Sequence, residues 1–165
     1  MLKRAFDAGV PAAWVAGDSV YGDNWALRMW REEHHHAHGL AVSGKASGWQ
    51  AGRPHQGNSL GAPLGAEGWS RCSAGDGTKG PRWDAWRWRP LATPLQPPWR
   101  RGLVVRRSRH APTALTAYVG FAPPATGLET VGQVAGRRWT VARCCAEAHG
   151  EVGLDQYAGR NGTGW

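Results

Sequence analysis

Apolar and polar positions alternate most regularly in the second half of the chain, where they predict a strand pair followed by a helix. Two apolar-rich runs, Gly102–Arg107 and Ala114–Phe121, are joined by a loop containing Pro112, a pattern typical of paired β-strands. Gly127 then precedes a helix expected from Leu128 to about Ala148. Its apolar face consists of Val131, Val134, Ala135, Trp139 and Val141.

The rest of the chain predicts shorter elements. Ser43–Glu67 is rich in Gly, Ser, Pro and Asn, so it is either a mobile loop or a region that has lost its fold. Strand-like residues resume at Trp83–Leu91. The alternation of strands and helices favours an α/β or α+β layer fold. The N-terminal elements are a helix over Leu2–Ala8, a strand over Ala13–Gly17, a turn over Asp18–Gly22, a helix from an Asp23 N-cap to about Glu33, and a strand over Gly39–Val42.

Composition narrows the classes of partner. The 165 residues fit one domain, and the net charge of +8 with a pI near 10.3 favours a polyanionic partner, nucleic acid before membrane. No apolar run is long enough to span a bilayer, and the N-terminus lacks the apolar core of a signal peptide, so we expect no membrane partner. Cys72, Cys144 and Cys145 predict neither a disulfide framework nor a zinc site, which favours a cytoplasmic location.

Three unusual features each leave alternatives. The eleven tryptophans, several beside arginines, are either stacking rings among phosphate-binding cations or the product of a drifting GC-rich gene. The histidine run His34–His38 is either a metal site or an incidental polar helix end, and its spacing favours the second. Ser73–Gly80 lacks the spacing of a nucleotide-binding loop, so we expect a turn in which Lys79 contacts a nucleic-acid backbone.

Asp18 is the strongest candidate for a reactive side chain. The apolar run Trp14–Gly17 leads directly into this single carboxylate, and a turn bounded by Gly22 follows it. A carboxylate at the exit of a buried strand is held on rigid backbone while its oxygens face solvent, which suits a Mg²⁺ ligand. The alternative is a turn former or a helix N-cap.

The C-terminal part of the chain carries Arg137–Val141 followed by Glu147–Tyr157, and this pattern resembles the signature of bacterial insertion-sequence transposases of the DDE superfamily. Three further stretches agree with that family in the same order. They are Ala8–Pro11 running into Gly17–Gly22, then Ser73–Pro81, then Tyr118–Pro123.

The resemblance implies an α/β architecture, a partial RNase H-like fold with a β-rich insertion between the second and third catalytic-acid positions. Such enzymes use three carboxylates and two divalent metal ions, Mg²⁺ or Mn²⁺, to cut and join DNA. By resemblance Asp18 is the second acid and a metal ligand, and Arg138 lies near the active site. Within one partial catalytic domain, 1–42 is then a core segment, 43–68 a poorly ordered loop, 69–123 the insertion, and 127–157 the last core helix with its signature turn.

Departures from the family pattern predict an inactive protein. The first acid is expected on a strand upstream of the chain, and the third acid position is Ala142, while His149 replaces an expected lysine. Glu147 and Glu151 are the carboxylates on the same segment that would substitute for the third acid. We therefore expect a truncated, degenerate transposase, cytoplasmic and nucleoid-associated, in which Mg²⁺ or Mn²⁺ is not bound productively.

Two other functions remain compatible with the sequence. One is a non-enzymatic nucleic-acid-binding fragment, partnered with DNA and with a full-length transposase relative. The other is an unstable product without a function. The cations expected to contact DNA are Lys79, Arg106, Arg107, Arg137 and Arg138, with Arg100, Arg101 and Arg109 as further phosphate contacts; a solvated basic face is the competing interpretation.

Overall fold

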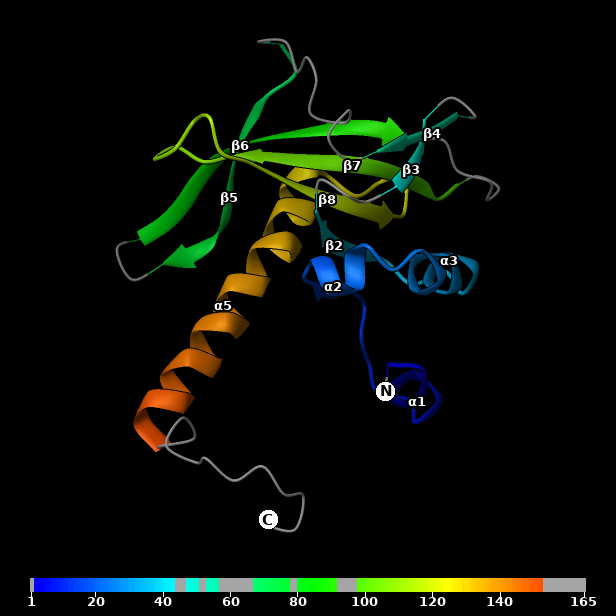
Figure 1. Ribbon diagram of the computed structural model, residues 1–165, viewed down its shortest axis with the longest axis horizontal. Coiled ribbons are helices and arrows are strands. Elements are labelled where there is room, and N and C mark those ends of the chain that lie inside the picture. Colours follow the sequence, from blue (N-terminus) through cyan, green and yellow to red (C-terminus); the bar gives the residue numbers. More distant parts are fainter. Residues whose placement is uncertain are drawn as a thin grey trace.

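A computed structural model describes residues 2–43, 47–50, 53–56, 67–77, 80–91 and 98–152 (Figure 1). The helices are α1 (Leu2–Asp7), α2 (Ser19–Gly22), α3 (Trp25–Glu33) and α5 (Leu128–Val152). The strands are β1 (Val15–Gly17), β2 (His38–Val42), β3 (Ser47–Gln50), β4 (Arg53–Gln56), β5 (Ser70–Gly77), β6 (Gly80–Leu91), β7 (Arg100–Arg107) and β8 (Leu115–Ala122).

One curled six-stranded sheet organises the fold, in the order β1-β2-β8-β7-β6-β5. β1 and β2 are parallel, and they are connected through α2 and α3, whereas every other pairing in this sheet is antiparallel. β3 and β4 form a separate two-stranded sheet. The fold is therefore mixed α/β, as the alternation of elements predicts, with a parallel unit at one edge of an otherwise antiparallel sheet.

α5 packs across one face of the sheet and contacts β1, β2, β5 and β6. A glycine allows this close approach. A Cβ on Gly136 would lie 2.2 Å from the carbonyl oxygen of Ala74, which is too close, whereas one on Gly132 would make ordinary van der Waals contact with the Trp86 ring at 3.4 Å. Gly136, which weakens the helix in isolation, is therefore the residue that lets it dock. The core under α5 consists of Ala41, Cys72, Ala74, Trp86, Val104, Tyr118, Val131 and Ala135.

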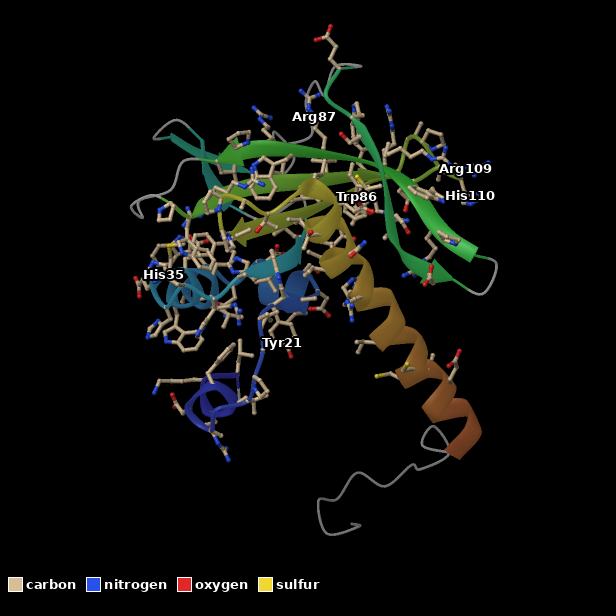
Figure 2. The ribbon with its side chains drawn as sticks, turned by 180° about the vertical axis from the view of Figure 1, so that it is seen from behind. Tyr21, His35, Trp86, Arg87, Arg109 and His110 are labelled. Atoms are coloured by element: carbon tan, nitrogen blue, oxygen red, sulfur yellow. The ribbon has the colours of Figure 1, made fainter. Side chains whose placement is uncertain are left out.

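Figure 2 shows Trp86 where the start of α5 meets the sheet, and Arg87 on the opposite side of β6. That alternation is the ordinary consequence of strand geometry. The second face of the sheet carries its own cluster of buried apolar residues, namely Val42, Leu91, Leu103, Val105 and Val119. The second face is thus buried along β2, β7, β8 and the end of β6. The second half of α5 extends beyond the sheet (Figure 1).

α1 is held by aromatic contacts rather than by a buried apolar face, because none of its residues is buried. The ring of Phe6 stacks on His36 with centroids 3.9 Å apart and meets Trp30 edge-on at 6.3 Å. His34 lies against the same Trp30 ring, and its Nδ1 is 2.7 Å from the carbonyl oxygen of that residue. The histidine run therefore joins α1 to α3.

The structure differs from the sequence expectations in three places. The segment 43–68, expected as a loop, contains the strands β3 and β4. β5 occupies much of the stretch expected as a turn, because its register with β6 supplies the pairing that its Gly and Ser residues do not favour on their own. The N-cap of α3 is Asn24, whose side chain accepts from Leu27 N, while the carboxylate of Asp23 instead accepts from Ser43.

Candidate functional site

Asp18 follows β1 directly, as the sequence predicts, and its carboxylate caps α2. Oδ1 accepts a hydrogen bond from Val20 N at 3.0 Å, and the carbonyl oxygen of Asp18 accepts from Gly22 N at 2.9 Å. The side chain is half-buried at the edge of the sheet. Asp18 is therefore the N-cap of α2, and this contact holds its carboxylate in place.

Arg137 lies beside the same strand. It lines an open hollow of about 350 Å³ between α5 and β1, together with Trp14, Ala16, Thr130, Gln133 and Val134. The approach of α5 to this edge leaves little room at Gly39, where a Cβ would meet a side-chain carbon of Val134 at 3.3 Å. The structure thus brings Arg137 to the strand that precedes Asp18, whereas the resemblance assigns the position near the active site to Arg138.

Arg138 faces a different environment from its neighbour. Burial raises the pKa of Tyr118 on β8, and the positive charges of Arg106 and Arg138 oppose that rise. Arg138 is half-buried, whereas Arg137 is exposed. The Arg137–Arg138 pair therefore divides between the β1 edge and the interior.

Of the candidate carboxylates on α5, the described one, Glu147, forms no metal-binding group with Asp18. Glu147 is exposed on the outer half of the helix, and the side chains of Ala142 and Glu151 lie outside the described part of the chain, as does the whole of Lys79. Among the residues that are described, no group of three or more His, Cys, Asp or Glu side chains could hold a metal ion. These described residues do not fit a two-metal centre.

A second candidate region lies at one end of β5, β6 and β7. It is an open groove of about 590 Å³ lined by Arg71, Trp83, Asp84, Ala85, Arg107, Ser108, Arg109 and Pro112, and we call it the basic groove. The guanidinium of Arg71 lies 4.9 Å from the Trp83 ring, and that of Arg107 lies 4.2 Å from the Trp69 ring. Figure 2 shows Arg109 beside His110 at this end of the sheet. Sequence reasoning missed Arg71, because nothing in its flanking residues marks it.

Arg106 takes part in holding the groove rather than in lining it. Its Nε donates to Asp84 Oδ2 at 2.7 Å, and Arg109 N donates to Asp84 Oδ1 at 3.1 Å. Both oxygens of this buried carboxylate are therefore engaged, which fixes the loop that carries Arg109.

Arg100 and Arg101 occupy positions that sequence reasoning did not foresee. The Nε of Arg101 donates to both carboxylate oxygens of Glu32 at 3.0 and 2.9 Å, and the pair is buried between β7 and α3. Arg100 donates to the carbonyl oxygen of Thr126 and lies over the Trp88 ring at 4.8 Å. Both had been expected as phosphate contacts, but these partners show structural roles for their guanidinium groups.

None of the helices within the described residues has the length and apolarity needed to cross a membrane. No family model, curated protein or solved structure matches the chain.

Proposed function

We propose that this chain is a degenerate part of a DDE transposase catalytic domain, descended from an enzyme that cut and joined DNA strands and itself inactive. The observation that carries the proposal is the position of Asp18. It directly follows the edge strand β1, and α5, which bears the Arg137–Arg138 signature, packs on that strand with Arg137 and Ala16 lining the same hollow.

The connectivity of the sheet supports the same ancestry. β1 and β2 form a parallel pair joined by helices, a run of antiparallel strands follows, and α5 returns to pack on β1 and β2. The resemblance to an RNase H-like core with a β-rich insertion implies the same order of elements. A carboxylate follows one parallel strand, the insertion comes next, and a last helix packs against the core strands. The strands β5–β8 occupy the segment that the resemblance assigns to the insertion.

Ala142 supports the loss of activity. The resemblance expects an acid there, and a methyl group cannot coordinate a metal ion. Two-metal chemistry depends on a complete carboxylate set, and each missing electrostatic group costs several kcal/mol of transition-state stabilisation.

The activity is tested directly on supercoiled plasmid DNA with Mg²⁺ or Mn²⁺. We expect no nicking or strand transfer above the level of a preparation of the Asp18→Ala variant. Divalent-dependent nicking by the natural sequence that disappears in this variant would overturn the proposed inactivity.

The ancestry is tested by restoring the third acid. We expect Ala142→Glu to create Mn²⁺ binding, seen as loss of the free Mn²⁺ electron paramagnetic resonance signal, that is abolished by adding Asp18→Ala. Ala146→Glu, one helical turn further along α5, is the matched control and should bind no Mn²⁺. Equal Mn²⁺ binding by Ala142→Glu with and without Asp18, or none at all, would contradict the assignment of Asp18 as the second acid.

The basic groove favours a second candidate function, non-enzymatic nucleic-acid binding. Arg71 and Arg107 place positive charge over the rings of Trp83 and Trp69, and Arg109 lines the same groove. Cations beside aromatic rings are suited to phosphates and stacked bases.

This second function predicts salt-dependent binding of single-stranded oligonucleotides, measured by fluorescence anisotropy. The double variant Arg107→Gln/Arg109→Gln should weaken binding and reduce the slope of log K against log salt by about 1.4, or about 0.7 for each phosphate that is no longer neutralised. Arg4→Gln, on the exposed side of α1, is the control for simple removal of charge. If Arg4→Gln and the double variant lose the same affinity per charge removed, the groove is excluded as the binding site.

A further inference from the structure

A large hollow lies on the other side of β1 from α5, between α1, β1, α2 and α3. Its volume is about 660 Å³, within the range of small-molecule sites. Its walls are formed by Leu2, Ala5, Val15, Ala16, Gly17, Tyr21, Asn24, Leu27, Arg31 and Leu40. Figure 2 shows Tyr21 on the side of the body that faces α1. Most of this wall is apolar, and none of the residues named for the basic groove belongs to it.

Arg31 is the charged residue of this wall, and no described carboxylate pairs with it. The side chain is 1% exposed, and Nη2 donates to the carbonyl oxygen of Ala37 at 3.1 Å. Within the described part of the chain, the Nε and Nη1 atoms of this guanidinium have no hydrogen-bond partner. Phe6 supplies a weaker contact, with its ring centroid 5.4 Å from the guanidinium carbon. Burial lowers the pKa of Arg31 to about 10.

The other polar groups of the wall do not neutralise this cation. The side-chain oxygen of Asn24 accepts from Leu27 N as the cap of α3, and Tyr21 is more than half exposed. Burying a charge without a counter-charge costs free energy, and the residues of this wall supply no counter-charge for Arg31. The hollow therefore combines a mainly apolar wall with one cationic residue, Arg31.

We propose that this hollow binds a small amphipathic carboxylate, with the carboxylate paired to Arg31 and the apolar chain lying along Leu2, Ala5 and Leu27. A carboxylate carries one negative charge, which one guanidinium can match, whereas a phosphate dianion would bring a second charge against an apolar wall. Since α1 contributes Leu2 and Ala5 to the wall but buries no residue, it can shift as the ligand enters. This inference is independent of the proposed transposase ancestry.

The test uses sodium octanoate as the probe, with 1-octanol as the uncharged probe of equal chain length. We expect saturable binding of one octanoate per protein by isothermal titration calorimetry, and at least tenfold weaker binding of 1-octanol. In Arg31→Gln the octanoate affinity should fall at least tenfold, to near that of 1-octanol, whose own affinity should not change. Absence of saturable octanoate binding, or equal affinities for the two probes in the natural sequence, would overturn the proposal.

A second variant keeps Arg31 in place, which guards against a failure of Arg31→Gln to fold. Ala5→Trp places an indole on the wall of the hollow from the surface helix α1, so octanoate binding should fall at least tenfold while the unfolding midpoint without ligand stays near that of the natural sequence. Ala12→Trp, exposed on the segment between α1 and β1, is the matched control and should bind octanoate normally. Unchanged octanoate affinity in Ala5→Trp would also overturn the proposal.

Discussion

Two buried arginines on neighbouring parts of the molecule have opposite electrostatic environments. Arg101 is 8% exposed and is held by both oxygens of Glu32, whereas Arg31, the residue before that glutamate, is more deeply buried and donates to a backbone carbonyl. Arg31 lies on the inner side of α3 and Arg101 contacts that side from β7, where the buried residues of the helix are charged rather than apolar. The comparison shows that burial alone does not define a structural ion pair. Arg101 belongs to a complete ion pair, whereas Arg31 lines the hollow in which we propose that a carboxylate ligand pairs with it.

The largest effect is expected from Glu32→Gln, which removes the counter-charge of Arg101. An uncompensated buried guanidinium should lower the free energy of unfolding by about 3–5 kcal/mol. The measurement is urea unfolding followed by tryptophan fluorescence. Glu33→Gln, exposed on the same helix, is the control and should change stability by less than about 0.5 kcal/mol. Similar unfolding midpoints for Glu32→Gln and Glu33→Gln would show that the Arg101–Glu32 pair stabilises the fold no more than a surface ion pair.

The next effect is a decrease in stability at acid pH that originates at His38. This side chain is fully buried, its Nε2 lies 4.0 Å from Glu32 Oε1, and burial together with the charge of Arg31 lowers its pKa to about 3. Between pH 6.5 and 3 the unfolded chain binds a proton that the folded chain refuses, so this contribution to stability falls as pH drops. Burial also raises the pKa of Glu32. Above the ordinary pKa of a glutamate, the folded chain therefore keeps a proton that the unfolded chain has lost, so the contribution of Glu32 to stability falls as pH rises.

From pH 7 to pH 5 the His38 contribution should amount to about 2 kcal/mol, at about 1.4 kcal/mol per pH unit below 6. Urea unfolding at the two pH values measures it. His38→Gln, which stays neutral throughout, should lose most of this difference. A natural sequence whose stability does not change between pH 7 and 5 would contradict the buried neutral state of His38.

The smallest effect is expected from Arg31→Met. Because no carboxylate in the described part of the chain pairs with this guanidinium, its replacement by an apolar side chain should change the free energy of unfolding by about 1 kcal/mol or less, in either direction. Arg101→Met sharpens the comparison, since it leaves Glu32 buried without this cation and should cost several times more. Equal decreases in stability for the two Met variants, measured by the same unfolding curves, would erase the distinction between the two arginines.

Local pattern predicts much of this fold. The pair β7 and β8 follows from two apolar runs around a Pro-containing loop, and α5 follows from apolar residues at helical spacing. β5 is missed because Ser70–Gly77 contains few strand-favouring residues, and it is held by pairing with β6. The caps of α2 and α3 show the limit of local rules: Asp18 and Asn24 are caps, whereas Asp23 is taken by a contact twenty residues away at Ser43.

The candidate sites were less predictable. Asp18 is visible in the sequence because a strand and its following carboxylate are adjacent along the chain. The roles of Arg101 and Arg106 depend on Glu32 and Asp84, which are 69 and 22 residues away, so a run of basic residues looks equally available for phosphate until the sheet forms. The hollow beside Arg31 combines side chains from several helices and strands, and no spacing along the chain marks it.

The glycines of α5 affect how readily each half of the helix unfolds locally. Gly132 and Gly136 make its first half a poor helix by itself, and the sheet beneath supplies the missing stability. Beyond Arg138 the described side chains are exposed, Val141 to 63%, so none of them provides such support. Amide hydrogens of the first half should therefore exchange with solvent when the whole domain opens, whereas those of the outer half should exchange by local fraying. One continuous helix thus divides into a part that shares the lifetime of the sheet and a part that does not.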